Sequence, residues 1–243
     1  MGIICKNCDN SFAGQYCNNC GQNANTHKIN SHFLLHDIQH GILHFDKGIF
    51  YSIKEMFTRP GSSILDFIKG KRVKHFKPIS MVVVIATICS FLFHHFRIDI
   101  FEFQPPDLQL DVIDLNEWIE NHFARATLAT LPLYTIGTYL CYKKQGFNFL
   151  ELLVLNSFNA SQRLLVRIAA FPLFYYFNGT PEILLLLRLF LIIDLLLIFW
   201  TNVQFFEKVS KLKTFFLSLL SYGIFLICLY LLSIMVLLIE GIY

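Results

Sequence analysis

The chain has 243 residues, of which 55% are hydrophobic and only 15% are charged. A soluble domain carries roughly 25% charged residues, so this composition excludes an ordinary soluble domain and is typical of a membrane protein. The net charge is only +3, so the distribution of charge along the chain is more informative than the total.

Four cysteines lie within the first 20 residues in the spacing Cys-x2-Cys-x8-Cys-x2-Cys, and they are Cys5, Cys8, Cys17 and Cys20. Zinc prefers four tetrahedral thiolates, and each Cys-x2-Cys turn presents two of them. The spacing therefore predicts a zinc ribbon over residues 1–24, whose structural zinc supplies the folding free energy. A disulfide or a redox pair is the alternative. A cytosolic location disfavours the first, and so short a segment lacks the context for the second.

The N-terminus lacks the basic and apolar regions of a signal peptide, so we expect this head to stay in the cytosol. Lys6 is the only basic residue within the cysteine pattern, and no aromatic platform accompanies it. Nucleic acid is therefore not expected as a partner, and the head is interpreted as a contact for a cytosolic protein or as a structural cap.

Residues 25–77 form a predicted juxtamembrane linker that begins with an amphipathic, histidine-rich helix. At about 100° per residue, the apolar residues between 34 and 49 share one face, and four histidines share the opposite one. These histidines are His32, His36, His40 and His44. They are open to three interpretations: a solvated polar face, a metal or pH-sensing site, or a contact with a partner or a lipid headgroup.

Two short helices are expected next. The first covers 49–57 and ends at Thr58-Arg59-Pro60-Gly61, because proline cannot continue a helix. The second starts at a cap on Ser62 or Ser63 and ends at Gly70. A basic run then precedes the first long apolar segment, and it consists of Lys69, Lys71, Arg72, Lys74 and Lys77. Such a run orients the next helix with its start in the cytosol and attracts anionic lipids.

In this order, the motifs resemble a family of uncharacterised membrane proteins common in Bacteroidetes, described as a domain of unknown function. The matching segments are Cys5 to Gln22, Asp46-Lys47-Gly48, Thr58-Arg59-Pro60-Gly61, Gly70-Lys71-Arg72 and Lys77-Pro78. The resemblance covers about the first 80 residues, and the rest is similar only in hydropathy. It implies an architecture and a membrane location but no activity.

Residues 78–243 are predicted to form a helical membrane domain. A bilayer core needs about 20 apolar residues per helix, and five segments qualify: 79–96, 123–142, 149–177, 183–206 and 215–239. The segments expected inside are basic and the loop 97–122 is acidic, as the positive-inside rule requires. The sequence thus predicts an all-α, polytopic protein of the cytoplasmic (inner) membrane, with its C-terminus outside.

Polar residues interrupt the third and fourth predicted spans, and they are Asn156, Asn159, Arg163, Arg167, Arg188 and Asp194. The third span is therefore either a broken helix or an interfacial helix before a shorter span. Arg167 and Asp194 lie about 15 Å and 18 Å from the outer ends of their spans, so they could pair. Charges within a membrane either hold helices together or form a functional site, and both interpretations stay open.

Three functions are compatible with this pattern. The favoured one is a non-enzymatic adaptor, sensor or assembly factor with a cytosolic zinc-binding head. The second is a small-molecule or ion transporter using the polar residues of the third and fourth spans, although internal repeats are not evident. The third is a metal-dependent membrane enzyme using the histidine ladder, but the sequence shows no nucleophile–base pair and no known catalytic motif.

Overall fold

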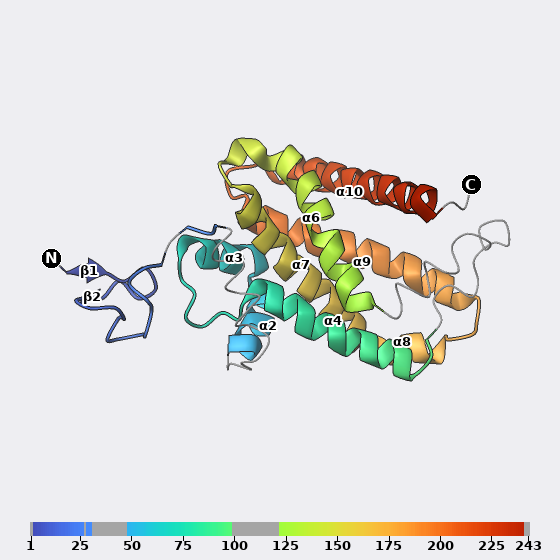
Figure 1. Ribbon diagram of the computed structural model, residues 1–243, viewed down its shortest axis with the longest axis horizontal. Coiled ribbons are helices and arrows are strands. Elements are labelled where there is room, and N and C mark those ends of the chain that lie inside the picture. The colour runs from blue at the N-terminus through green and yellow to red at the C-terminus, as the bar shows by residue number, and fades with distance from the viewer. Residues whose placement is uncertain (1, 27, 31–47, 99–121, 241–243) are drawn as a thin grey trace.

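The structure, a computed structural model, describes residues 2–26, 28–30, 48–98 and 122–240, and in these residues a small head adjoins a bundle of helices (Figure 1). The head contains a two-stranded antiparallel sheet of β1 (Ile3–Ile4) and β2 (Ser11–Phe12). The helical part consists of α2 (Gly48–Thr58), α3 (Pro60–Lys69), α4 (Pro78–His95), α6 (Phe123–Tyr142), the 3-10 turn η2 (Lys143–Gln145), α7 (Phe149–Ala169), α8 (Phe171–Tyr176), α9 (Glu182–Phe205) and α10 (Lys211–Glu240).

Three of these helices are long and apolar enough to cross a membrane, so the prediction of five spans is not supported. They are α4, α9 and the Lys211–Leu232 part of α10. The predicted spans 79–96, 183–206 and 215–239 correspond to these three helices. The predicted span 123–142 is a helix with the same bounds, α6, but Arg125, Pro132 and several threonines reduce its apolar character.

The predicted third span, 149–177, is not one continuous helix, and a break was one of the two alternatives that its polar residues left open. The chain forms α7, leaves the helix at Ala170 and continues as the short α8, in whose first turn Pro172 lies. α7 packs against α2, α3, α4, α6 and α9, so protein rather than lipid surrounds much of it. A helix in this position can carry polar side chains, because partners on neighbouring helices can satisfy them.

α2 and α3 lie at the end of the bundle that adjoins the head (Figure 1). α2 ends at Thr58 and α3 begins at Pro60, so a single residue, Arg59, separates them. The expected cap at Ser62 or Ser63 is therefore wrong. Pro60 instead opens α3, because proline suits the first turn of a helix, where its missing N–H would have no intrahelical partner.

Gly61 allows α3 to pack directly on the end of α9. A Cβ atom at this position would lie 2.2 Å from the carbonyl oxygen of Thr201 and 2.4 Å from the backbone nitrogen of Phe205. At the other end of α3, Gly70 adopts a left-handed conformation with φ of 112°, which ends the helix as predicted.

The basic connections of the bundle gather at the head end. The turn after α6 carries Lys143 and Lys144, and the connection between α9 and α10 carries Lys208. Both connections lie at the end where α3 meets α9, whereas the C-terminal end of α10 lies at the opposite end (Figure 1).

Candidate functional site

The head consists of two backbone turns of the same kind, one for each Cys-x2-Cys pair. In the first, the Cys5 N–H donates to the Asn10 carbonyl, and the Asp9 N–H donates to the Cys5 carbonyl, each at 2.9 Å. In the second, Cys17 makes the equivalent bonds to Gln22 and Gly21, at 2.8 and 2.9 Å. Asp9 and Gly21 both have a positive φ, of 57° and 76°. This repeated geometry aims both side chains of each pair toward one point.

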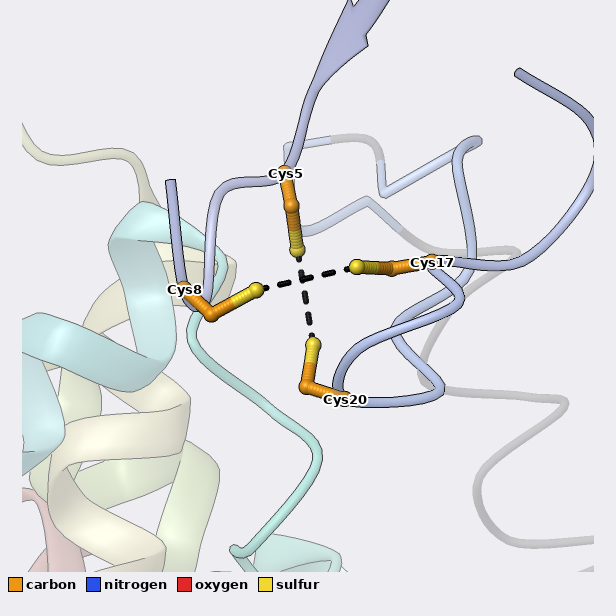
Figure 2. Close-up of side chains that lie close together, drawn as sticks. All are labelled: Cys5, Cys8, Cys17 and Cys20. Atoms are coloured by element: carbon orange, nitrogen blue, oxygen red, sulfur yellow. Dashed lines mark hydrogen bonds between the residues drawn. The ribbon is translucent and has the colours of Figure 1, made fainter. Parts of the chain in front are cut away.

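The four cysteine sulfur atoms converge on a common centre between the two turns (Figure 2). All four lie within 4.8 Å of one another, with Cys5 3.5 Å from Cys20 and Cys8 3.6 Å from Cys17. A disulfide would need about 2.05 Å. Four sulfurs at about 2.3 Å from a tetrahedral ion would lie roughly 3.8 Å apart, so the cluster has dimensions that fit a metal ion.

The surroundings of the cluster favour thiolates at two of the four cysteines. Burial disfavours the charged form, and at Cys5 it prevails and raises the pKa to about 11. At Cys17 burial is outweighed by hydrogen bonds from the backbone of Asn19 and Cys20, which lower the pKa to about 6. The pKa of Cys20 is also lowered, against its burial, by the backbone of Gln22. Backbone N–H groups aimed at sulfur stabilise the form that binds a metal.

The head is fastened to the helical part by polar contacts around Gly70 and Arg72. The Arg72 N–H donates to Oε1 of Gln22 at 3.4 Å, next to a hydrogen bond within the head from Lys6 to the Thr26 carbonyl at 2.6 Å. Gly70 lies against Lys6 and Thr26, so the end of α3 contacts the head directly. The metal cluster is therefore held at the end of the bundle.

The segment that follows the head is anchored in the bundle itself. Ile29 is 2% exposed and belongs to the main apolar core, and its carbonyl accepts a hydrogen bond from Asn148 at 3.4 Å. Asn148 also caps α7, because its side chain and that of Glu151 exchange bonds with each other's backbone. The spacing Asn-x-x-Glu is a readable capping signal that the sequence reasoning missed.

The predicted lipid-surface residues have different surroundings. Lys71 forms an ion pair with Asp66 at 3.1 Å, and Lys74 lies 6.0 Å from the centre of the Tyr51 ring. Arg72 instead donates to the Phe67 carbonyl at 3.1 Å and lies over the Phe67 ring. Lys69 is exposed in the last turn of α3, and Lys77 is the half-buried N-cap residue of α4.

Arg59 links α2 to α3, a role that sequence reasoning missed. Its Nε lies 2.6 Å from Glu55 of α2, and its Nη1 lies 3.1 Å from Asp66 of α3. The Glu55–Arg59 spacing of four residues could have indicated the first contact, but the second depends on how α3 folds back.

Three charged residues meet between α7 and α9. Arg167 Nη2 forms an ion pair with Asp194 Oδ2, as the sequence predicts, and Arg163 Nη1 lies 3.9 Å from the same oxygen. Asp194 is 3% exposed. Two guanidinium groups therefore share one buried carboxylate, and the cluster keeps a net positive charge.

The other predicted polar residues differ in their environment. Asn156 donates to Thr135 and Thr138 of α6, at 3.1 and 3.2 Å, so it joins helices. Asn159 is 2% exposed, and neither atom of its amide group has a hydrogen-bond partner among the residues that the structure describes. Arg188 is exposed on α9. The histidine ladder His32, His36, His40 and His44 lies outside the described residues.

The structure also shows polar partners that the sequence did not indicate. On α10, Ser218 contacts the Tyr142 hydroxyl at 3.1 Å and accepts from Asn202 of α9 at 2.9 Å. Ser221 lies 3.4 Å from Thr138, so α6, α9 and α10 are linked by side-chain hydrogen bonds. Serine and threonine at these positions gave no periodic signal, because each bond depends on a partner far away in the sequence.

One family model matches the chain, over residues 46–89, and its description is a protein of unknown function, DUF3667. The match covers α2, α3 and the first part of α4 and leaves out the four cysteines. It supports the expected resemblance to a family of unknown function over the motif segment, while the bacterial lineage stays a prediction. No curated protein and no solved structure matches the chain.

Proposed function

We propose that this is an integral membrane protein whose N-terminal head binds one structural zinc ion and presents a rigid surface to a cytosolic partner, as an adaptor, sensor or assembly factor. The observation that carries the proposal is the four-sulfur cluster held on the end of α3. Three helices suited to crossing a membrane support the membrane location.

Zinc is the metal that best suits this donor set. Four cysteine sulfurs are soft ligands in a closed tetrahedral arrangement, which is typical of structural zinc sites and leaves no open position for a substrate. Cys5, Cys8, Cys17 and Cys20 would hold the ion. The apolar cluster of the head includes the cysteines themselves with Phe12 and Ala24, so metal binding would supply most of its stability.

The distribution of charge supports a cytosolic head in the cytoplasmic membrane. The basic run 69–77 and the connections with Lys143, Lys144 and Lys208 lie at the head end of the bundle. Cytoplasmic loops carry an excess of lysine and arginine. With α4, α9 and α10 crossing, the C-terminal end of α10 would then lie outside.

Metal analysis of the purified full-length chain tests this proposal. We expect one zinc per chain, lost in Cys17→Ser and kept in Cys141→Ser, which removes a thiol outside the head. A chain that purifies folded without zinc or another metal would contradict the proposal. A second equivalent of metal that is lost in His36→Ala or His40→Ala would instead favour the metal-dependent enzyme or sensor using the histidine ladder.

A transporter is the second candidate, and one observation favours it. The amide of Asn159 and one oxygen of Asp194 are buried without hydrogen-bond partners in the described part of the chain, close to Arg163. Unpaired polar atoms at such depth are expensive unless water or a solute reaches them. Proteoliposomes would separate the roles, because a transporter gives a proton or chloride flux that Asp194→Asn abolishes, and a purely structural pair gives none in either protein.

A further inference from the structure

A polar pocket lies where the head meets α2 and α3. Its volume is about 260 Å³, and its lining includes Tyr51, Arg59, Asp66, Lys71, Lys74 and His75 from the helical part. The head contributes Asn7. A water molecule occupies about 30 Å³ in the liquid, so the pocket has room for a larger polar group. Neither the metal cluster nor the charged cluster of α7 and α9 includes these residues.

The lining carries an excess of positive charge. Arg59, Lys71 and Lys74 contribute three positive charges, and Asp66 contributes one negative charge. Glu55, which forms an ion pair with Arg59, contributes a second negative charge. Burial lowers the pKa of His75 to about 4, so this ring is neutral near pH 7. The pocket thus keeps a net positive charge, and Lys69 and Arg72 nearby add to the positive potential.

Asp66 holds two cations of the pocket, Arg59 and Lys71, in place, and each keeps hydrogen-bond donors for a further acceptor. Asp66 accepts from Arg59 through Oδ2 and from Lys71 through Oδ1, both at 3.1 Å, which fixes the two side chains beside each other. Their side chains are 46% and 48% exposed. A guanidinium has five N–H donors and an ammonium has three, so each can bind a further acceptor. Lys74 has no carboxylate partner among the residues that the structure describes.

We propose that this pocket binds the phosphate group of an anionic phosphate ester, with Arg59, Lys71 and Lys74 as its ligands. Phosphate oxygens match a guanidinium fork and lysine ammonium groups held side by side. Lys71 and Lys74 also lie just before Pro78, where the candidate span α4 begins, and basic residues that flank a span lie near the lipid headgroups. A general attraction of basic residues to the membrane would need no cavity, whereas this site is a pocket with defined lining residues.

Two sources could supply the phosphate group, an anionic lipid or a soluble ester, and native mass spectrometry of the full-length protein in detergent distinguishes them. The probes are phosphatidylglycerol, phosphatidylcholine and glycerol 3-phosphate. The test variant is Lys71→Ala with Lys74→Ala. The control is Lys69→Ala with Lys144→Ala, which removes the same charge from exposed positions at the same end of the bundle.

We expect the wild type to retain one phosphatidylglycerol in preference to phosphatidylcholine, and the test variant to bind it about tenfold more weakly or worse. The control should stay within about twofold of the wild type. Displacement by glycerol 3-phosphate at comparable concentration would assign the site to a soluble ester, and failure to displace would assign it to the lipid. Both results support the phosphate site.

Two results would overturn the proposal. One is equal weakening in the test and control variants, which means a diffuse charged surface. The other is that the wild type retains neither phosphatidylglycerol nor glycerol 3-phosphate. Because Lys71 pairs with Asp66, the single variant Lys74→Ala is measured as well. It removes a pocket cation without breaking an ion pair among the described residues, and weaker binding at an unchanged melting temperature excludes a folding defect as the cause.

Discussion

At the scale of single residues, the position of Gly61 has the sharpest consequence. A side chain there would meet the backbone of α9 at Thr201 and Phe205 rather than the end of a flexible side chain. Backbone atoms of a packed helix cannot move aside cheaply, so any residue larger than glycine would separate α3 from α9.

We predict that Gly61→Ala lowers the free energy of unfolding by about 1–3 kcal/mol through overpacking. The measurement is thermal unfolding of the purified protein in detergent. Gly223→Ala is the matched control, because a Cβ at this position in α10 would meet no atom within 4 Å. An equal melting temperature for Gly61→Ala and the wild type would contradict the close packing of α3 on α9.

Asp66 should make the stability depend on pH. Burial would raise its pKa, but the neighbouring Lys71 and Arg59 outweigh burial and hold the pKa below the ordinary value of 3.8. A carboxyl whose pKa is lower in the folded state than in the unfolded state binds its proton more readily when unfolded. Its contribution is therefore present above about pH 4 and is lost as the pH falls further.

We therefore predict that Asp66→Asn is less stable than the wild type at pH 7, and that the difference is smaller at pH 3. Denaturant unfolding at both pH values measures it. The cysteines of the head also gain protons in acid, so the relevant quantity is the difference between the two proteins. Glu207→Gln, at an exposed position outside these ion pairs, is the control. A difference that grows in acid would contradict the assignment.

At the scale of helices, the junction of α7 and α9 depends on a single buried carboxylate. Removing the acidic partner would leave the partly buried Arg163 and Arg167 close together without a counter-charge. Breaking a buried ion pair in this way costs about 3–5 kcal/mol, because the remaining charge is uncompensated.

Asp194→Leu should accordingly lower the free energy of unfolding by about 3 kcal/mol or more, measured as loss of folded protein in a detergent melting experiment. Arg188→Gln, an exposed change on the same helix, should have little effect. Recovery of stability in the charge-swapped Asp194→Arg with Arg167→Asp would show that the pair acts as a brace. A stable Asp194→Leu protein would exclude that role.

The helices themselves could be predicted well because apolar runs and proline or glycine boundaries are local signals. The bounds 123–142 are those of α6, and the α2 and α3 helices occur where they are expected. The number of spans could not be predicted, because a helix buried by protein and a helix facing lipid can both be hydrophobic. α7 carries Asn156, Asn159 and Gln162 within a predicted span, and this polar character was the signal that set it apart from a helix facing lipid.

The candidate sites also divide into those that a local sequence pattern predicts and those that form only when distant segments meet. The cysteine cluster follows from two local spacings, and the structure brings its sulfurs together as the pattern indicated. The pairing of Arg167 with Asp194 followed from their estimated depth, but the second arginine, Arg163, did not. The pocket of Arg59, Lys71 and Lys74 depends on how the head, α2 and α3 meet, and no local pattern contains that arrangement.

At the scale of the whole molecule, the head and the bundle should lose their structure separately. The described head contains strands and turns but no helix, and the main apolar core of the helical part begins with Ile29. Metal removal should therefore unfold the head and leave the bundle intact.

A strong zinc chelator is predicted to leave the far-ultraviolet helical signal nearly unchanged and to make the first 26 residues sensitive to protease. Circular dichroism and mass mapping of the proteolytic fragments give the two readouts. The control is Cys17→Ser, which should be cleaved in this region even without chelator. Loss of most helical signal on chelation would show instead that the metal stabilises the entire chain.

The contact of α2 with α7 also sets an order of events during synthesis. Gln162 donates to the Met56 carbonyl across 106 residues of chain. Ribosomes add about 5–20 residues per second, so this partner emerges roughly 5–20 seconds after α2 is complete. During that interval α4 can already enter the membrane, while α2 and α3 can pack on each other but not yet on α7 or α9. α2 and α3 therefore reach their final packing only after α7 and α9 have been made.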